Sequence, residues 1–326
     1  MNQSHLLMPF MNCHHFLSCA FRSMEVFSTL RACTFMKCKE SGVTTHSRRG
    51  CGRLTYPDFN KYGKWSVITG ATDGIGKETA FQLASRGQNI ALISRNTERL
   101  KNVAKEIESK HNVQTKCLAI DFSDDEEIYD KIADFLQGLD IGTLVNNVGT
   151  DQELVRFLEQ SNLSLIIRNL VRLNIMSILK MTQIVLPGMV ERKRGLILNL
   201  SAFPILHPIG KYAIMNATKS FVNLFSQALS YEYESEGITI QSCRPGAVGT
   251  KSSQQFGDLE RMTSPKDYCT SWLATVDKAR WTHGHWQHAV EAWVWEKIPT
   301  GLVQKLAEYF YFEPGEKALQ DIEKNK

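Results

Sequence analysis

The sequence predicts an α/β fold in which a single domain is built on a doubly wound parallel sheet and carries an N-terminal extension. Short apolar runs that suit buried strands alternate with amphipathic stretches that suit helices, from residue 65 to about residue 242. The first run, residues 65–69, ends in a glycine-rich turn that opens directly into a helix. Strands and helices that alternate in this way form a parallel sheet with helices on both faces.

The glycine-rich turn predicts a dinucleotide-binding site of the Rossmann type. Gly70, Gly74 and Gly76 follow Thr69 in the spacing TGxxxGxG. The first glycine permits a tight turn, the second lets a pyrophosphate approach the backbone, and the third lets the helix pack closely on the strand. The helix then presents free N–H groups and a positive dipole end to the phosphates. A strand before the turn and a periodic helix after it make the pattern far more specific than a lone glycine motif.

The later elements follow in the same order. Asn96 caps a charged helix that ends near Lys110, and Ser123 with Glu126 forms a capping box for a helix that ends near Leu136. The expected strands are 65–69, 89–94, 115–120, 143–145, 196–200 and 238–242, and the further helices are 152–160, 163–185 and a long one ending near 236. In such a sheet the ligand lies at the carboxyl ends of the strands.

The first 60 residues differ in composition from the rest of the chain. They hold seven Lys and Arg against three acidic residues, and five of the eight cysteines without a CxxC pair. Residues 61–326 are balanced in charge and give no sign of nucleic-acid binding. We therefore expect a leader over 1–60 for targeting or peripheral membrane association. The domain is expected over 61–326, with a substrate loop and a C-terminal tail after about residue 250.

The basic, serine-containing and acid-poor leader is similar in composition to mitochondrial targeting segments, with the endoplasmic reticulum as the alternative compartment. A disordered tail or an interfacial helix explains the same composition. No apolar run in the leader reaches the ~18 residues that a membrane span requires, and the cysteine pattern predicts no disulfide framework.

From about residue 61 to 250 the sequence resembles the short-chain dehydrogenase/reductase family. Besides the glycine turn, it has Asn-Asn-Val-Gly at 146–149, Asn174 within a helix, and Arg-Pro-Gly at 244–246 followed by Thr250. The phrases GATDGIGK, ISRN, NNVG and LPGMVERK are most similar to the 17-beta-hydroxysteroid dehydrogenase type 3/12 branch. The resemblance implies a nicotinamide dinucleotide held by Thr69, Gly70, Gly74, Ile75, Gly76, Arg95, Asp121, Asn147, Lys219, Pro245, Gly246 and Thr250.

Arg95 favours NADP (NADPH) over NAD as that cofactor. An NAD site offers Asp or Glu to the ribose 2′-hydroxyl after the second strand, where this chain has Ser94 and then Arg95. A guanidinium suits a 2′-phosphate, and a solvated Arg at a helix start is the alternative interpretation. Asp121, at the end of the third strand, resembles the family's adenine-contacting acid, although a turn before a helix also favours Asp.

Active members of the family pair a Ser, a Tyr, a Lys and an Asn. Tyr and Lys at i and i+4 share one helix face, so the ammonium lowers the pKa of the phenol and the phenol donates a proton. Here Lys219 and Asn174 are retained, but Met215 stands at the Tyr position and Ala202, next to Ser201, at the Ser position. A thioether carries no proton, and a methyl group does not hydrogen-bond a carbonyl oxygen.

Loss of a general acid costs ~10²–10⁴ in rate, and loss of one oxyanion donor ~10²–10³. The sequence therefore predicts a protein that binds NADP but lacks oxidoreductase activity. The alternative, which the resemblance implies, is an active NADP-dependent enzyme on a hydrophobic small molecule, either a steroid or a 3-oxoacyl substrate. Tyr212 is a candidate replacement phenol, but the helical rise of ~1.5 Å per residue puts it ~10 Å from Lys219. An ordinary residue near the helix start is the simpler interpretation.

Two further groups of residues allow other interpretations. His283, His285 and His288 resemble metal ligands in spacing, but we interpret them as tail residues and predict no metal. The aromatic residues between 281 and 311 are candidates for a lipid-facing or substrate-covering tail.

A helical apolar stripe bears on the oligomeric state. It is interpreted either as core or as a helix–helix dimer face, so a homo-oligomer is expected. The stripe consists of Phe221, Leu224, Phe225 and Leu229.

Overall fold

The computed structural model describes residues 54–256 and 259–307. The predictions for the leader concern residues 1–60, of which residues 1–53 lie outside the described residues. The end of the aromatic tail, beyond residue 307, also lies outside them.

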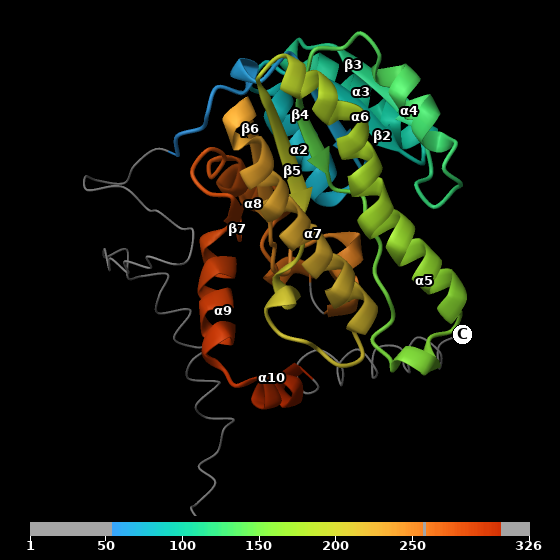
Figure 1. Cartoon of the computed structure of the whole chain (residues 1–326), viewed down its shortest axis with the longest axis vertical. Helices are drawn as coiled ribbons and strands as arrows, with labels where there is room; N and C mark the ends of the chain where they lie inside the picture. The colour runs from blue at the N-terminus through green and yellow to red at the C-terminus, as the bar shows by residue number, and fades with distance from the viewer. Residues whose placement is uncertain (1–53, 257–258, 308–326) are drawn as a thin grey trace, which may run out of the picture. The chain divides into compact units, whose positions relative to one another are not determined.

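The core of the domain is a seven-stranded sheet in the order β3-β2-β1-β4-β5-β6-β7 (Figure 1). Every neighbouring pair of strands is parallel, so the doubly wound parallel sheet is confirmed. The strands are β1 Trp65–Thr69, β2 Asn89–Ser94, β3 Thr115–Ala119, β4 Ile141–Asn146, β5 Gly195–Leu200, β6 Ile238–Cys243 and β7 Trp281–Thr282. The strand order reverses between β1 and β4, which is where ligands bind in such sheets. The two-residue strand β7 was not predicted.

Helices cover both faces of the sheet. The α-helices of the described residues are α2 Gly74–Ala84, α3 Thr97–His111, α4 Ile128–Leu136, α5 Leu163–Val171, α6 Ser177–Glu191, α7 Ala213–Tyr233, α8 Pro265–Leu273, α9 Trp286–Lys297 and α10 Thr300–Ala307. One hydrophobic core holds side chains of α2, α3 and α8, and the other holds side chains of α4, α6 and α7. Neighbouring residues of β1 enter opposite cores, Ile68 the first and Val67 the second, because side chains alternate along a strand.

Two sequence-based assignments are wrong. Residues 152–160 form no α-helix, only the single 3₁₀ turn Phe157–Glu159. The Gln152 side chain donates to Lys211 O and accepts from the Met215 N–H, and these bonds hold the segment against the start of α7. The capping box is absent as well, because the Ser123 N–H and hydroxyl both donate to Asp121. Helix α4 begins only at Ile128.

The helical stretch Leu163–Glu191 contains a π-helical turn, Arg172–Met176, between α5 and α6. Such turns often occur at functional sites, and this one carries the buried Asn174. Within the described ranges, the same stretch is the one helix with the length and composition of a membrane span. Its α6 half packs in the second core through Met181, Val185 and Met189.

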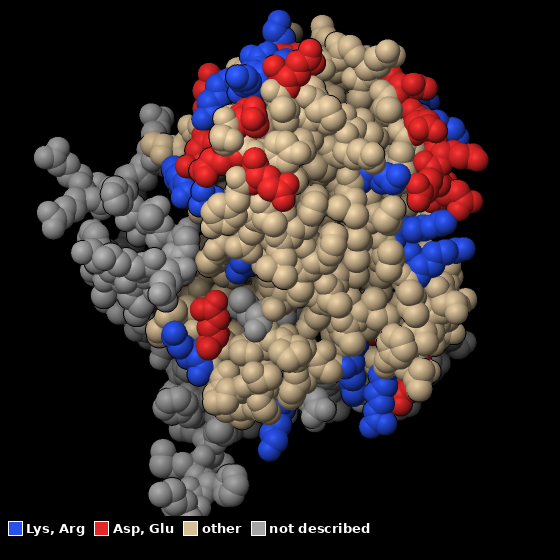
Figure 2. All heavy atoms as spheres, viewed as in Figure 1, with Lys and Arg blue, Asp and Glu red and all other residues tan. Residues whose placement is uncertain are grey.

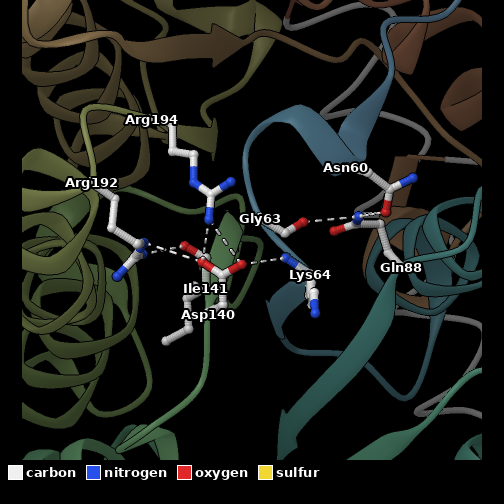
Figure 3. Close-up of polar contacts among 8 residues, drawn as sticks. All are labelled: Asn60, Gly63, Lys64, Gln88, Asp140, Ile141, Arg192 and Arg194. Atoms are coloured by element: carbon white, nitrogen blue, oxygen red, sulfur yellow. Dashed lines mark hydrogen bonds and ion pairs between the residues drawn. The ribbon is translucent and has the colours of Figure 1, made fainter.

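The amino ends of β1 and β4 meet in a close backbone contact. A Cβ on Gly142 would lie 2.4 Å from Gly63 N, so only glycine fits there. Next to Gly142, Asp140 at the start of β4 is bonded both to the start of β1 and to the segment between α6 and β5 (Figure 3). It accepts from Lys64 N and forms ion pairs with Arg192 and Arg194 at 3.2 and 3.1 Å. This contact fixes the end of the sheet opposite to the strands' carboxyl ends.

We expect Gly142→Ala to lower the free energy of unfolding by about 1–3 kcal/mol, because the new methyl group overlaps the Gly63 backbone. Urea unfolding followed by circular dichroism measures the change. Gly301→Ala is the matched control, since nothing lies within 4 Å of a Cβ at that helical position and no loss is expected. Equal stability of the two variants would show that the backbone contact is not tight.

Candidate functional site

A cavity of about 560 Å³ lies at the carboxyl ends of the strands, where the strand order reverses. Most of the residues predicted from the sequence line it. They are Gly70, Gly74, Ile75, Arg95, Asp121, Asn147, Ala202, Met215, Lys219, Pro245, Gly246 and Thr250. Thr69, Gly76 and Asn174 lie behind the cavity wall. The structure therefore brings residues from seven separate segments of the chain to one cavity.

The turn after β1 is held against the loop after β4. The Thr69 hydroxyl accepts from the N–H groups of Asn147 and Val148, both at 3.0 Å, and the Asn147 amide donates to Thr69 O and Gly70 O. A Cβ on Gly76 would lie 2.4 Å from the Asn147 amide nitrogen. Gly76 thus permits the approach of helix α2, and the N-terminus of α2 faces the cavity at Gly74 and Ile75.

A basic group stands at the mouth of the cavity beyond β2. The Arg95 side chain is 79% exposed and its guanidinium lies 3.9 Å from the Asp121 carboxylate. Burial alone would raise the pKa of Asp121, but hydrogen bonds from Ser123 and the charge of Arg95 lower it. Arg99 also lines this part of the cavity and was not singled out from the sequence. This end of the cavity therefore favours the binding of an anionic group.

Lys219 lies in the inner wall of the cavity, and the fully buried Asn174 lies behind that wall. Lys219 is buried, and its Nζ donates to Leu200 O at 3.1 Å. Burial lowers the pKa of Lys219 to about 8, and the negative charge of Asp151 opposes this shift. The Asn174 amide donates to Thr150 O and to Met215 Sδ, the latter at 3.3 Å.

The structure places no hydroxyl at either substituted position. Met215 and Ala202 both line the cavity. The neighbouring Ser201 does not substitute for position 202, because its buried hydroxyl donates to Lys219 O at 2.7 Å.

Tyr212, the candidate replacement phenol, also lines the cavity but is bound to a carboxylate. Its hydroxyl donates to Asp151 at 2.5 Å. Burial and the charge of Asp151 both raise the pKa of Tyr212 well above its usual value. Asp151 was not predicted, because nothing in its local sequence marks it.

The part of the cavity away from the glycine turn is apolar. Its walls come from several loops and from the two last described helices, α9 and α10. Trp295 is one of the aromatic residues expected in a lipid-facing or substrate-covering tail, whereas Val303 was not predicted. The apolar lining consists of Leu154, Leu173, Phe203, Ile209, Trp295 and Val303.

The histidine group lies near the cavity and is neutral at pH 7. Burial lowers the pKa of both His283 and His288 to about 4. Within residues 54–256 and 259–307, no cluster of three His, Cys, Asp or Glu side chains is arranged to hold a metal ion.

Comparison with known proteins finds relatives that are all named as dehydrogenases or reductases. Residues 64–260 match the family model described as short chain dehydrogenase. The chain is 43% identical to a very-long-chain 3-oxoacyl-CoA reductase of Anas platyrhynchos over 75% of this chain and 78% of that protein. It is 42% identical to the protein of that name from Homo sapiens, with the same coverage. A short-chain dehydrogenase from Sphingobium yanoikuyae in complex with NADPH is 25% identical, with a TM-score of 0.62 over 72% of this chain and 96% of that chain.

These relatives contradict one prediction. Met215 and Ala202 led to the expectation that the chain lacks oxidoreductase activity, yet relatives with 42% and 43% identity over three quarters of the chain are named reductases. The argument from two positions was wrong because it treated the loss of two hydrogen-bonding groups as the loss of the reaction. Such losses slow a reaction, and a further titratable group, Lys219, lines the same cavity.

Proposed function

Since this chain belongs to the short-chain dehydrogenase family, we propose that it is an NADPH-dependent oxidoreductase acting on the carbonyl group of a hydrophobic 3-oxoacyl thioester. The observation that carries the proposal is the shape of the cavity. It joins a glycine turn and a basic mouth at one end to an apolar chamber at the other, with a buried lysine in the wall between them. Relatives named very-long-chain 3-oxoacyl-CoA reductases support the substrate class over a steroid.

The cavity fits the cofactor. Gly70 and Gly74 have φ angles of +65° and +53°, which glycine adopts freely, and they bring the turn and the N-terminus of α2 to the cavity. Arg95, with Arg99 beside it, binds the 2′-phosphate that distinguishes NADPH from NADH. When bound, NADPH supplies a hydride to the substrate.

Lys219 supplies the proton in this proposal. Its ammonium group has three N–H bonds, of which one is directed to Leu200 O. With a pKa near 8 the ammonium is still the main form at pH 7, and it is a much stronger acid than an ordinary lysine. An N–H bond breaks as the new O–H bond of the product forms, and solvent then restores the proton to the amine.

Tyr212 is the weaker proton donor of the two. Its hydroxyl already donates to Asp151, and a phenolate would form next to that carboxylate. Burial of the phenol and the like charge of Asp151 both disfavour the phenolate, and both raise the pKa of Tyr212.

A substrate with a long acyl chain partitions into bilayers, and in this proposal the bilayer is that of the endoplasmic reticulum. The relatives give no support to a mitochondrial location. A homo-oligomer remains a prediction. Of the apolar stripe on α7 that suggested a dimer face, Leu224 is exposed and Leu229 is buried.

We expect Arg95→Ala to weaken NADPH binding by about tenfold and to leave NADH binding unchanged, because a charge-assisted contact with the 2′-phosphate is lost. Calorimetric titration of both nucleotides measures this. Arg156→Ala is the matched control, since its side chain is also 79% exposed but lies outside the cavity lining. Equal loss of NADPH and NADH affinity would contradict the role of Arg95.

We expect the rate of 3-oxoacyl-CoA reduction to fall as the pH rises through about 8, because the ammonium form of Lys219 is then lost. The sign follows from a lowered pKa of a cationic acid: the active form is present below that value. Lys219→Arg keeps the positive charge, but the guanidinium is a far weaker acid than the ammonium. This variant should therefore reduce the rate by ~10²–10⁴. A pH profile of NADPH oxidation that is flat across pH 8 would argue against this donor.

We expect Met215→Tyr to raise the rate on the order of 10²-fold, because it places a phenol one helical turn before Lys219. Adding Ala202→Ser should raise it further, since the hydroxyl and the phenol act on one oxygen. Steady-state rates of the single and double variants test this, with Tyr212→Phe as a control that should change little. A double variant that binds NADPH but is no faster than the natural chain would refute the assignment of these positions.

A further inference from the structure

The outward side of α9 exposes apolar side chains in helical register. Trp286, Val290, Trp293 and Val294 recur at spacings of three and four residues, which places them on one helix face. They are between 40% and 61% exposed, and Leu302 of α10 is 49% exposed. We name these five side chains the tryptophan face. Exposed apolar side chains that gather on one helix face mark interaction surfaces.

The inward side of the same two helices forms a wall of the cavity. Trp295 and Val303 line its apolar end, and Trp295 packs edge-on against Phe203 with ring centroids 6.4 Å apart. The backbone is fixed there too, because His207 Nε2 bonds Trp295 O at 2.8 Å and Gln304 accepts from Gly210 N at 2.9 Å. The tryptophan face therefore lies directly outside the chamber that takes the hydrophobic part of a ligand.

The charges around the tryptophan face favour an anionic surface. Lys297, at the end of α9, and Lys305, on α10, are exposed. The acid Glu291 is largely buried, and burial raises its pKa. Glu296 is exposed. Burial lowers the pKa of Arg244 to about 10, and the charge of Glu296 opposes this shift, so the charge of this acid acts on Arg244. Figure 2 shows Lys and Arg groups on both sides of the uncharged surface over α10.

We propose that the tryptophan face docks on the surface of an anionic lipid bilayer, with the indoles of Trp286 and Trp293 at the level of the headgroups. Tryptophan suits this position because the ring is apolar and its N–H is polar, and lysines bind the anionic headgroups. The apolar end of the cavity then takes its substrate from the bilayer, a step that rests on the proposed function. The docking itself does not depend on which substrate is used.

The experiment uses the full chain and vesicles of phosphatidylcholine and phosphatidylserine with brominated acyl chains, which quench tryptophan on contact. The chain has six tryptophans and none lies in residues 1–53, so the signal does not report on the leader. Trp65 and Trp272 are buried, whereas Trp286 and Trp293 are the exposed ones. We expect quenching by these vesicles, and weaker quenching by brominated phosphatidylcholine alone.

The matched variants are Trp286→Ser with Trp293→Ser, and as a control Leu158→Ser with Leu224→Ser, two exposed apolar residues elsewhere. Vesicle co-sedimentation should show a loss of affinity of about tenfold or more for the tryptophan pair and no change for the leucine pair. NADPH binding by calorimetry checks that each variant is folded and separates this test from the proposed function.

Three results would overturn the proposal. The first is that neither kind of vesicle quenches the tryptophan fluorescence. The second is co-sedimentation that does not change in the tryptophan pair. The third is a dimer in sedimentation velocity that the tryptophan pair converts to a monomer without any loss of vesicle binding, since the face would then be a contact between two copies of the chain.

Discussion

The contact between the turn after β1 and the loop after β4 is the constraint on which the site depends. One threonine hydroxyl, that of Thr69, accepts two backbone N–H groups of that loop, and the Asn147 amide closes the contact from the other side. A methyl group on Gly76 would collide with that amide. Because this contact sets how far α2 stands from β4, it places the N-terminus of α2 and the inner wall of the cavity at a fixed separation. The cofactor end of the cavity is therefore defined by packing and not by any group that reacts.

The reacting end of the cavity is organised differently. Met215 and Ala202 stand at the two positions where the family resemblance predicts hydroxyl groups, and the hydroxyl of the nearby Ser201 bonds the backbone of α7. What remains is an amine buried against Leu200 O and a phenol bound to Asp151. Burial makes the amine a stronger acid, whereas burial and the Asp151 carboxylate together make the phenol a weaker one. This contrast is why the proposed reaction uses Lys219 and why it is expected to be slow.

The sequence predicted those parts of the fold and site that local patterns determine. The glycine turn, its flanking strand and helix, and the six longer strands follow from spacing and periodicity, and the structure has them in the predicted order. The failed capping box has a local cause, since Ser123 bonds Asp121 two residues before it, but the failed helix has a tertiary cause. Residues 152–160 form no helix because Gln152 bonds the backbone of a segment some sixty residues later in the chain. Asp151 and Val303 reach the cavity only through the folding of distant segments, so no local pattern marked them. The expectation of an inactive protein failed because it judged a reaction from two positions alone.

The central claim is that this cavity transfers a hydride from NADPH to a 3-oxoacyl thioester. The most direct test is to supply the full chain with NADPH deuterated on the transferable side of C4 and a long-chain 3-oxoacyl-CoA, and to examine the acyl product by mass spectrometry. The account predicts a 3-hydroxyacyl product that carries one deuterium, formed by the natural chain and not by Lys219→Ala. A natural chain that binds NADPH but yields no deuterated product, or a Lys219→Ala chain that yields as much of it, would contradict the account.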